Sequence, residues 1–140
     1  MIMTRGQIED ALYKLVKNSP LPAAVNGGLY KRGYRPAKSS KEDIVVSVKM
    51  GTANQIQRGT ALITVFVPWI TIADGTDGRN ISRCNAIEIA LQQFISGLPA
   101  TASERNIRLS QSYAIGTDED EDVNHSRVVA ELDYNIFTEE

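Results

Sequence analysis

The order of its apolar periodicities constrains the fold of this chain more than any other feature. Two segments, 8–16 and 81–98, repeat apolar residues at helical spacing. Four others show strand-like alternation or β-branched runs, at 44–50, 56–67, 107–115 and 127–137. The predicted order is helix, arm, two strands, helix, two strands. Because this order lacks βαβ alternation, it predicts an α+β fold, with a mainly antiparallel sheet and two helices packed on one side.

Both predicted helices carry recognisable ends. Thr4 and Gln7 can form a capping box ahead of the first helix, and Pro20 ends it, because proline disfavours helical geometry in the residue before it. Asn80 or Ser82 can cap the second helix. We expect this longer helix to pack on the sheet through one stripe of residues: Ile81, Cys84, Ile87, Leu91 and Phe94.

The strands differ in how much of their surface is predicted to be covered. Residues 60–67 are largely apolar on both alternating faces, so we expect this strand at the centre of the sheet with both faces covered. The strand 127–137 places Glu131 and Asp133 on one face, which is typical of a sheet with one face in water. Residues 73–80 are predicted to form a polar turn, and 117–126 an acidic surface loop.

Length and composition exclude several classes of protein. With 140 residues we expect a single domain over 1–140, with an extended basic arm at about 20–42. Cys84 is the one cysteine, which excludes an intramolecular disulfide and any zinc site built on paired thiolates. No apolar run has the length of a membrane span, so we expect a cytoplasmic protein without membrane contact.

The charges are divided unevenly along the chain. Residues 1–50 hold nine Lys and Arg against four Asp and Glu, a net charge of +5. Residues 51–140 hold six against thirteen, a net charge of −7. The two signs are either solvated faces or opposite-signed surfaces that meet between copies of the chain.

Two polar segments offer weak site patterns. The run Asp118–Asp122 begins like a calcium loop, but Val123 and Val129 stand where that loop needs a glycine and a bidentate glutamate. Residues 74–80 precede a helix and could offer backbone N–H groups to an anion, but they carry two carboxylates and no P-loop lysine. Solvated loops are the preferred interpretation of both.

Two single residues suggest nucleophilic chemistry without supporting context. His125 stands next to Ser126, yet no G-x-S-x-G elbow is present to build a hydrolase site. Cys84 lies on the apolar stripe of the second helix, where cysteine is more often a small buried hydrophobe than a nucleophile. The sequence therefore predicts no catalytic residue, no cofactor and no metal ligand, and we expect no enzyme.

The basic arm is the segment that we predict to contact a partner. Its candidate interface residues are Tyr30, Lys31, Arg32, Tyr34, Arg35 and Lys38. Nucleic acid is disfavoured as the partner, because a duplex binder usually carries a net basic domain and this chain has a pI of ≈ 5.5. We expect reversal of Arg32, Arg35 and Lys38 to Glu to prevent assembly and to leave the fold nearly intact.

Nearly the whole chain contributes to one family resemblance. Its features in order are the helix Ile8–Val16, an arm at Gly28–Pro36 leading to the strand Ile44–Val48, a strand ending in Val65–Pro68, a long helix, and the final strand His125–Phe137. In this combination the layout resembles the tail completion or tail terminator proteins of long-tailed bacteriophages, the group that includes the minor tail protein U of phage lambda. The resemblance rests on the combination and on no single motif.

This resemblance implies a non-enzymatic structural protein of a phage or prophage. Such proteins assemble with themselves as a ring, commonly a hexamer, at the end of the tail tube and join it to the head connector. They act in the cytoplasm of the bacterial host during assembly and then in the virion tail. Two other classes stay open: a small cytosolic α+β binding module, and a small-molecule enzyme on a ferredoxin-like sheet, which would need a pocket with convergent polar groups.

Overall fold

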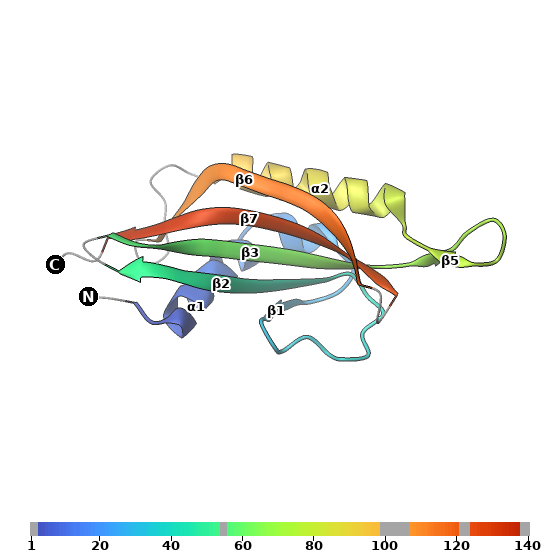
Figure 1. Cartoon of the computed structure of the whole chain (residues 1–140), viewed down its shortest axis with the longest axis horizontal. Coiled ribbons are helices and arrows are strands. Elements are labelled where there is room, and N and C mark those ends of the chain that lie inside the picture. The colour runs from blue at the N-terminus through green and yellow to red at the C-terminus, as the bar shows by residue number, and fades with distance from the viewer. Residues whose placement is uncertain (1–2, 54–55, 99–106, 121–123, 138–140) are drawn as a thin grey trace.

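The computed structural model describes residues 3–53, 56–98, 107–120 and 124–137, and its centre is a five-stranded sheet (Figure 1). The strand order is β1-β2-β3-β7-β6. β1 runs parallel to β2, whereas the other neighbouring pairs are antiparallel. The strands span Leu29–Lys31 (β1), Asp43–Ala53 (β2), Ile56–Pro68 (β3), Ile107–Asp120 (β6) and His125–Phe137 (β7).

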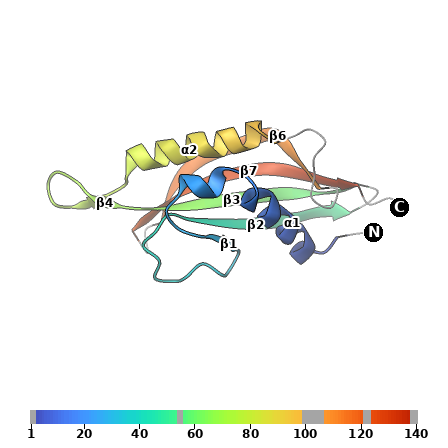
Figure 2. The ribbon, with the colours of Figure 1, turned by 180° about the vertical axis from the view of Figure 1, so that it is seen from behind.

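Both helices lie on the same side of this sheet (Figure 2). They are α1 (Arg5–Lys17) and α2 (Ile81–Ser96), and the short 3-10 helix η1 (Leu21–Ala24) lies between them. The predicted element order and the α+β fold, with two helices on one side of a mainly antiparallel sheet, are thus confirmed. Within the described ranges, no helix is both long enough and apolar enough to cross a membrane.

The helices begin where the local signals predict. The Thr4 hydroxyl accepts a hydrogen bond from the Gln7 backbone N–H (3.2 Å), and Gln7 Oε1 accepts one from the Thr4 N–H (2.9 Å), which confirms the capping box. The Asn80 side chain accepts a hydrogen bond from the Arg83 N–H (3.2 Å) at the start of α2. Each cap satisfies a backbone donor that has no partner within its helix.

α2 packs on the sheet through the predicted stripe, except at its first residue. The buried positions are Cys84, Ile87, Leu91, Phe94 and, one turn after Leu91, Ile95. The prediction is wrong for Ile81, which is 57% exposed. The reason is geometric, because α2 begins beyond the end of the core, where the chain returns from a projecting hairpin (Figure 2).

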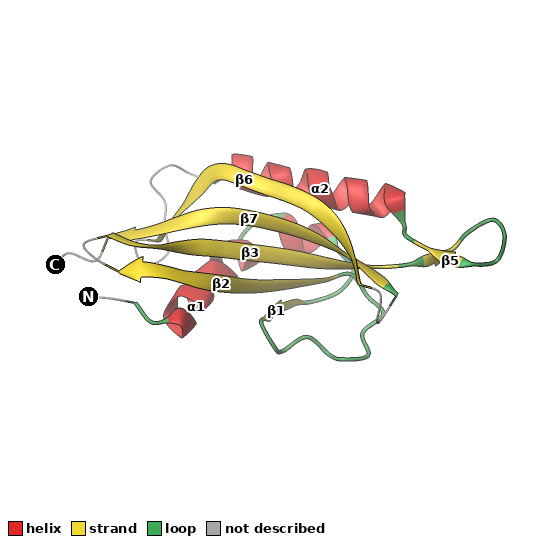
Figure 3. Ribbon diagram, in the orientation of Figure 1, coloured by secondary structure: helices red, strands yellow, loops and turns green. Residues whose placement is uncertain are grey.

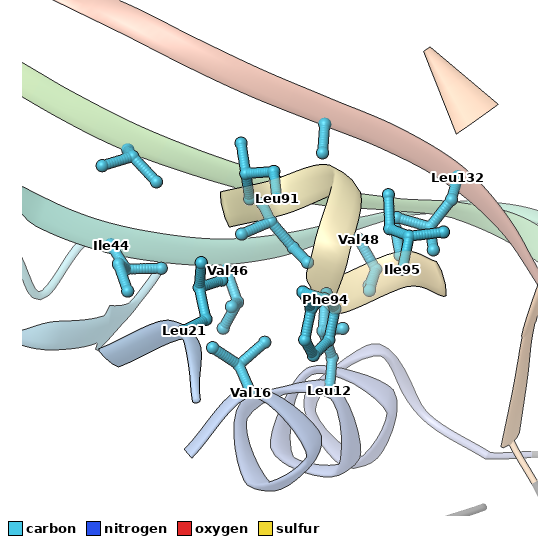
Figure 4. Packing of buried hydrophobic residues seen from close by; sticks show 14 of the residues in the cluster. Leu12, Val16, Leu21, Ile44, Val46, Val48, Leu91, Phe94, Ile95 and Leu132 are labelled. Atoms are coloured by element: carbon cyan, nitrogen blue, oxygen red, sulfur yellow. The ribbon is translucent and has the colours of Figure 1, made fainter. Parts of the chain in front are cut away.

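The core fills the space between the helices and the sheet (Figure 4). Both helices, η1 and the strands β2, β3 and β7 contribute buried side chains, among them Leu12 from α1, Leu91 from α2 and Val46 from β2. Burying one Leu or Ile side chain contributes about 1.5–3 kcal/mol. The buried side chains of the helix layer therefore contribute substantially to stability.

β3 is the central strand, but helices cover only one of its faces. Ile63 and Val65 are buried beneath the helix layer, whereas Leu62 and Phe66 on the opposite face are half-buried. The prediction that both faces are covered is wrong, because both helices pack on the same side. β3 thus leaves part of its apolar surface accessible.

Much of the predicted acidic loop belongs to two strands. β6 continues to Asp120, and Asp118 stands opposite Arg127 of β7. A cation opposite Asp118 offsets part of the repulsion among neighbouring carboxylates. The loop prediction for 117–126 is therefore wrong at 117–120 and 125–126, and residues 121–123 lie outside the described ranges.

The polar turn predicted at 73–80 belongs to a small β-hairpin. β4 (Ile70–Thr71) pairs antiparallel with β5 (Asp77–Gly78), and the turn lies between them. The hairpin projects from the five-stranded sheet beyond the start of α2 (Figures 1 and 3). It is a second, separate two-stranded sheet.

The arm at 20–42 begins in the helix layer and then joins one edge of the main sheet through β1. It contains η1, β1 and the segment 32–42, which we call the basic loop. β1 pairs with β2 only at Ile44–Val46. Farther along, the Glu9 carboxylate accepts a hydrogen bond from the Val48 backbone N–H (3.4 Å). Beyond the end of β1, a charged side chain of α1 thus takes up a backbone N–H of β2 that could otherwise pair with another strand.

Candidate functional site

The basic loop is fastened to the end of the sheet by a buried carboxylate. Asp43 Oδ2 lies 2.9 Å from Arg35 Nε and accepts a hydrogen bond from the Ser39 hydroxyl (2.5 Å). Its Oδ1 accepts one from the Gly28 backbone N–H (2.9 Å). The Arg35 and Asp43 side chains are 14% and 2% exposed. Asp43, at the start of β2, therefore binds both Gly28, just before β1, and the Arg35–Ser39 part of the basic loop.

The Arg35 guanidinium also covers the end of the open sheet face. It lies over the Phe66 ring, 4.1 Å from the ring centroid, and its Nη2 is 3.5 Å from His125 Nε2. The His125 ring meets Phe66 edge-on, and His125 is buried at the start of β7. His125 is thus a packed residue of a strand and not part of a surface loop.

These contacts correct one expectation for the candidate interface. Arg35 is largely buried and paired, so reversing its charge would place a carboxylate against Asp43. The premise that Arg35 is an exposed charge is therefore wrong, and we now expect its reversal to destabilise the fold. Arg35 positions the basic loop, and its side chain points into the protein.

Lys31 and Arg32 turn toward α1. Lys31 Nζ lies 3.0 Å from Asp10 Oδ1 and 5.5 Å from the centroid of the Tyr13 ring. Arg32 Nε lies 3.6 Å from Glu9 Oε2. Both cations link the edge of the sheet to the first helix, although Arg32 stays 56% exposed.

Replacing Lys31 by Met should raise the pKa of Asp10 toward its ordinary value of 3.8. The hydrogen bond from Lys31 lowers this pKa most, and Lys14 lowers it further. A lowered carboxyl pKa stabilises the fold above about pH 4, and this stabilisation is lost as the pH falls through the lowered pKa. NMR titration of the Asp10 carboxyl measures the shift.

Lys14→Met is the matched control for this titration, because it removes the weaker of the two cations. We expect it to raise the pKa of Asp10 less than Lys31→Met does. Equal shifts in the two variants would contradict the contact that holds β1 against α1.

The residues that the basic loop presents outward are fewer than the sequence predicts. Tyr34 is 76% exposed, and Lys38 and Lys41 are exposed beside it in the same loop. Tyr30 is half-buried in β1, where it stands opposite Val45. Of the six predicted interface residues, Arg32, Tyr34 and Lys38 are exposed, and Arg32 also lies against Glu9 of α1.

The fold converts the division of charge along the chain into a division across the sheet. Residues 29–53, which form the β1–β2 edge and the basic loop, hold six Lys and Arg against two Asp and Glu, a net charge of +4. The strands β6 and β7 hold two against five, a net charge of −3. The strand order places β1 and β2 at one edge of the sheet and β6, with β7 beside it, at the other (Figure 1). Arg35 brings the basic loop across the end of β3 to the start of β7.

The two charged edges also lie at the same level along the strands. Asp43, where the basic loop ends, is opposite Phe66, which is opposite Arg127, which is opposite Asp118. The acidic end of β6 and the start of β2, where the basic loop ends, therefore lie at the same level along the strands. Sequence reveals the uneven charge, but only the strand order reveals this placement.

A second ion pair fixes the basic loop to the helix layer. Arg83 of α2 binds both oxygens of Glu42, with Nε–Oε2 and Nη2–Oε1 distances of 2.7 Å each, and donates to the Ala24 carbonyl (2.8 Å). The Glu42 hydrogen bond raises the pKa of Arg83. No local signal in the sequence identifies this pair, because its partners are far apart along the chain.

Cys84 and the turn at 74–80 have the structural roles that the sequence predicts for them. Cys84 is buried, and burial raises the pKa of its thiol, as expected for a core residue. Asp74 accepts hydrogen bonds from the Thr76 backbone N–H (3.1 Å) and hydroxyl (2.6 Å), which lower the pKa of its carboxyl. An ionised carboxylate at this turn opposes anion binding there.

An apolar groove lies between the two helices and η1. Its volume is ≈ 600 Å³, and none of the described residues that line it is charged. The lining residues are Leu15, Asn18, Ser19, Pro20, Leu21, Ala24, Ala90, Gln93, Phe94, Gly97 and Leu98. Acid–base or nucleophilic chemistry needs convergent titratable groups, and the described part of this lining offers no charged side chain.

Comparison with known proteins shows similarity of fold only. No protein-family model matches the chain, and no curated relative does. One solved chain, known by a sequence identifier alone, is 15% identical with a TM-score of 0.56, and the match covers 99% of each chain. Another, a chain of the virion of a native gene transfer agent particle, is 14% identical with a TM-score of 0.52, over 94% of this chain and 95% of that one.

Proposed function

We propose that this chain is a structural protein of a phage or phage-like particle. In this proposal it assembles as a ring at the end of a tail tube and joins the tube to the head connector. The observation that carries the proposal is the placement of opposite charges at the two edges of one sheet. The likeness of the whole fold to a chain of a gene transfer agent virion supports it, as does the resemblance of the layout to tail terminator proteins.

A ring of identical subunits requires one surface of each copy to contact a different surface of the next. Here the acidic β6–β7 edge of one copy faces the basic loop of its neighbour. Opposite charges orient such a contact and speed the encounter more than they add affinity. Tyr34 supplies contact area at the centre of the loop, whereas Arg35 holds the loop in place.

This role requires no catalytic residue, no cofactor and no contact with membrane or nucleic acid. The partners are further copies of the chain, the tail tube and the connector. The subunit assembles in the bacterial cytoplasm and remains in the virion tail.

The variant Lys38→Glu/Lys41→Glu should need at least about tenfold more protein for half-assembly of rings than the wild type. The reason is that like charges then face each other across the contact. All the residues changed are exposed, so the free energy of unfolding should stay within about 0.5 kcal/mol. Light scattering after gel filtration and negative-stain microscopy, alone and with tail tubes, measure assembly.

Two comparisons separate charge complementarity from other effects. Lys38→Gln/Lys41→Gln removes the charge without reversing it and should weaken assembly less. Asp118→Lys/Glu131→Lys reverses the opposite edge, and mixing it with the first variant should restore mixed rings. A wild-type chain that stays monomeric both alone and with tail tubes would contradict the proposal.

A further inference from the structure

The β4–β5 hairpin, residues 70–78, adds nothing to the core of its own subunit. Residues 70–77 are all exposed and Gly78 is half-buried. Among the side chains that the structure describes, five large apolar ones are exposed, and three of them are Ile70, Ile72 and Ile81 at this end of the molecule. Apolar residues gathered on a projecting element mark an interaction site.

The hairpin is built to hold its shape while it projects. The Ile72 backbone N–H donates to the Thr76 carbonyl (2.8 Å), and the Gly75 N–H donates to the Ile72 carbonyl (2.9 Å). Gly75 has a φ of +84°, which the tight turn requires and which glycine adopts at low cost. A preordered hairpin loses little conformational freedom on binding, so its apolar contacts translate into affinity.

Ile70 and Ile72 lie two residues apart and so point to the same side of the ribbon. Gly78, the cross-strand partner of Ile70, has no side chain to cover them, and it lies against Ile72. The hairpin thus offers one apolar side. Its polar residues include Asp74 and Asp77, and residues 70–78 contain no Lys or Arg.

The groove between α1, η1 and α2 has the complementary character. Leu15, Phe94 and Leu98 give it an apolar wall, and Asn18 and Gln93 are available to hydrogen-bond a backbone. The last turn of α1, which supplies part of this wall, also carries the cations Lys14 and Lys17. The groove lies along the C-terminal half of α2, whereas the hairpin precedes the N-terminus of α2 (Figure 2).

We propose that the β4–β5 hairpin of one copy docks in this groove of the next copy. The inference rests on the ring proposed above and specifies a second contact in it. Because the hairpin and the groove lie at opposite ends of α2, each subunit offers one of each to different neighbours. Ile70 and Ile72 enter the apolar groove, and Asp74 and Asp77 lie near the cations of α1.

The hairpin contact supplements the contact between the charged edges. A stable interface buries about 800 Å² on each partner, more than a nine-residue hairpin alone supplies. Removing the hairpin contact should therefore weaken the ring without unfolding the subunit.

The variant Ile70→Ser/Ile72→Ser should raise the concentration needed for half-assembly by about tenfold or more, as expected when buried anchors are lost. Its thermal unfolding should match that of the wild type, because both residues are exposed. The matched control is Ile89→Ser, which makes the same change at a 54% exposed position on α2 outside the hairpin and the groove lining. The control should assemble within about twofold of the wild type.

Disulfide cross-linking tests the proposed pairing directly. Ile72→Cys and Gln93→Cys place one exposed thiol each on the hairpin and in the groove, and the native Cys84 is only 2% exposed. Oxidation should cross-link the two variants when they are mixed, and neither variant alone.

The outcomes separate this inference from the ring proposal. Normal ring formation by Ile70→Ser/Ile72→Ser, or assembled rings in which Ile72→Cys and Gln93→Cys do not cross-link, overturns the hairpin contact and leaves the ring proposal standing. Cross-links from the hairpin to a tail-tube protein, and not to Gln93→Cys, assign the hairpin to the tube and also overturn it. A wild-type chain that never assembles contradicts both.

Discussion

Replacing Asp43 by Ala should lower the free energy of unfolding by about 3–5 kcal/mol, the usual cost of removing one partner from a buried ion pair. The Asp43 side chain is 2% exposed and holds Arg35, Ser39 and the Gly28 backbone. Without it, the guanidinium stays largely buried over the Phe66 ring and loses its carboxylate. Urea unfolding followed by circular dichroism measures the loss.

A double-mutant cycle with Arg35→Met isolates the pair. The double variant should lose less stability than the two single variants together, because it leaves no buried charge without a partner. Lys38→Glu/Lys41→Glu alters charges in the same loop at exposed positions and should stay within about 0.5 kcal/mol of the wild type. A loss below about 1 kcal/mol in Asp43→Ala would contradict a fastening role for this carboxylate.

For the candidate site, sequence alone cannot tell residues that hold the basic loop in place from residues that are free to contact a partner. The sequence predicts that the basic arm is important, and it treats Arg35 and Lys38 alike. In the structure Arg35 is largely buried and Lys38 is exposed. Arg35 differs because the fold brings Asp43 and His125 to the same end of the sheet, where both contact it. His125 is distant from Arg35 in sequence. No local pattern encodes that meeting.

The fold also has features that neighbouring residues predict and features that depend on contacts between distant segments. The capping box at Thr4 and the α2 stripe through Leu91 follow from residues within a few positions of one another, and both are confirmed. The second face of β3 and the exposed start of α2 at Ile81 depend on which side the helices pack and where the core ends. The apolar residues Leu62 and Phe66 predict a covering layer, but no described helix packs on their face of the sheet, and Arg35 covers only the Phe66 end.

Ile87→Ala should destabilise the protein by about 2–5 kcal/mol, because it removes buried methyl groups and leaves a cavity between α2 and the sheet. Ile87 is 1% exposed and belongs to the core cluster. Ile89→Ala makes the identical change two residues away on the same helix, at a position that is 54% exposed. It should alter stability by no more than about 0.5 kcal/mol. Thermal and urea unfolding of both variants measure the difference.

This comparison also bears on assembly, because it separates the two faces of α2. Ile87 faces the sheet, so its loss acts on the subunit before any ring forms. Ile89 faces outward, beyond the groove lining, so its loss should change neither unfolding nor the concentration needed for half-assembly. Weakened assembly of a fully folded Ile89→Ala protein would instead place the outer face of α2 in the interface. The outer face of α2, in place of the hairpin, would then be a candidate for the second contact between subunits.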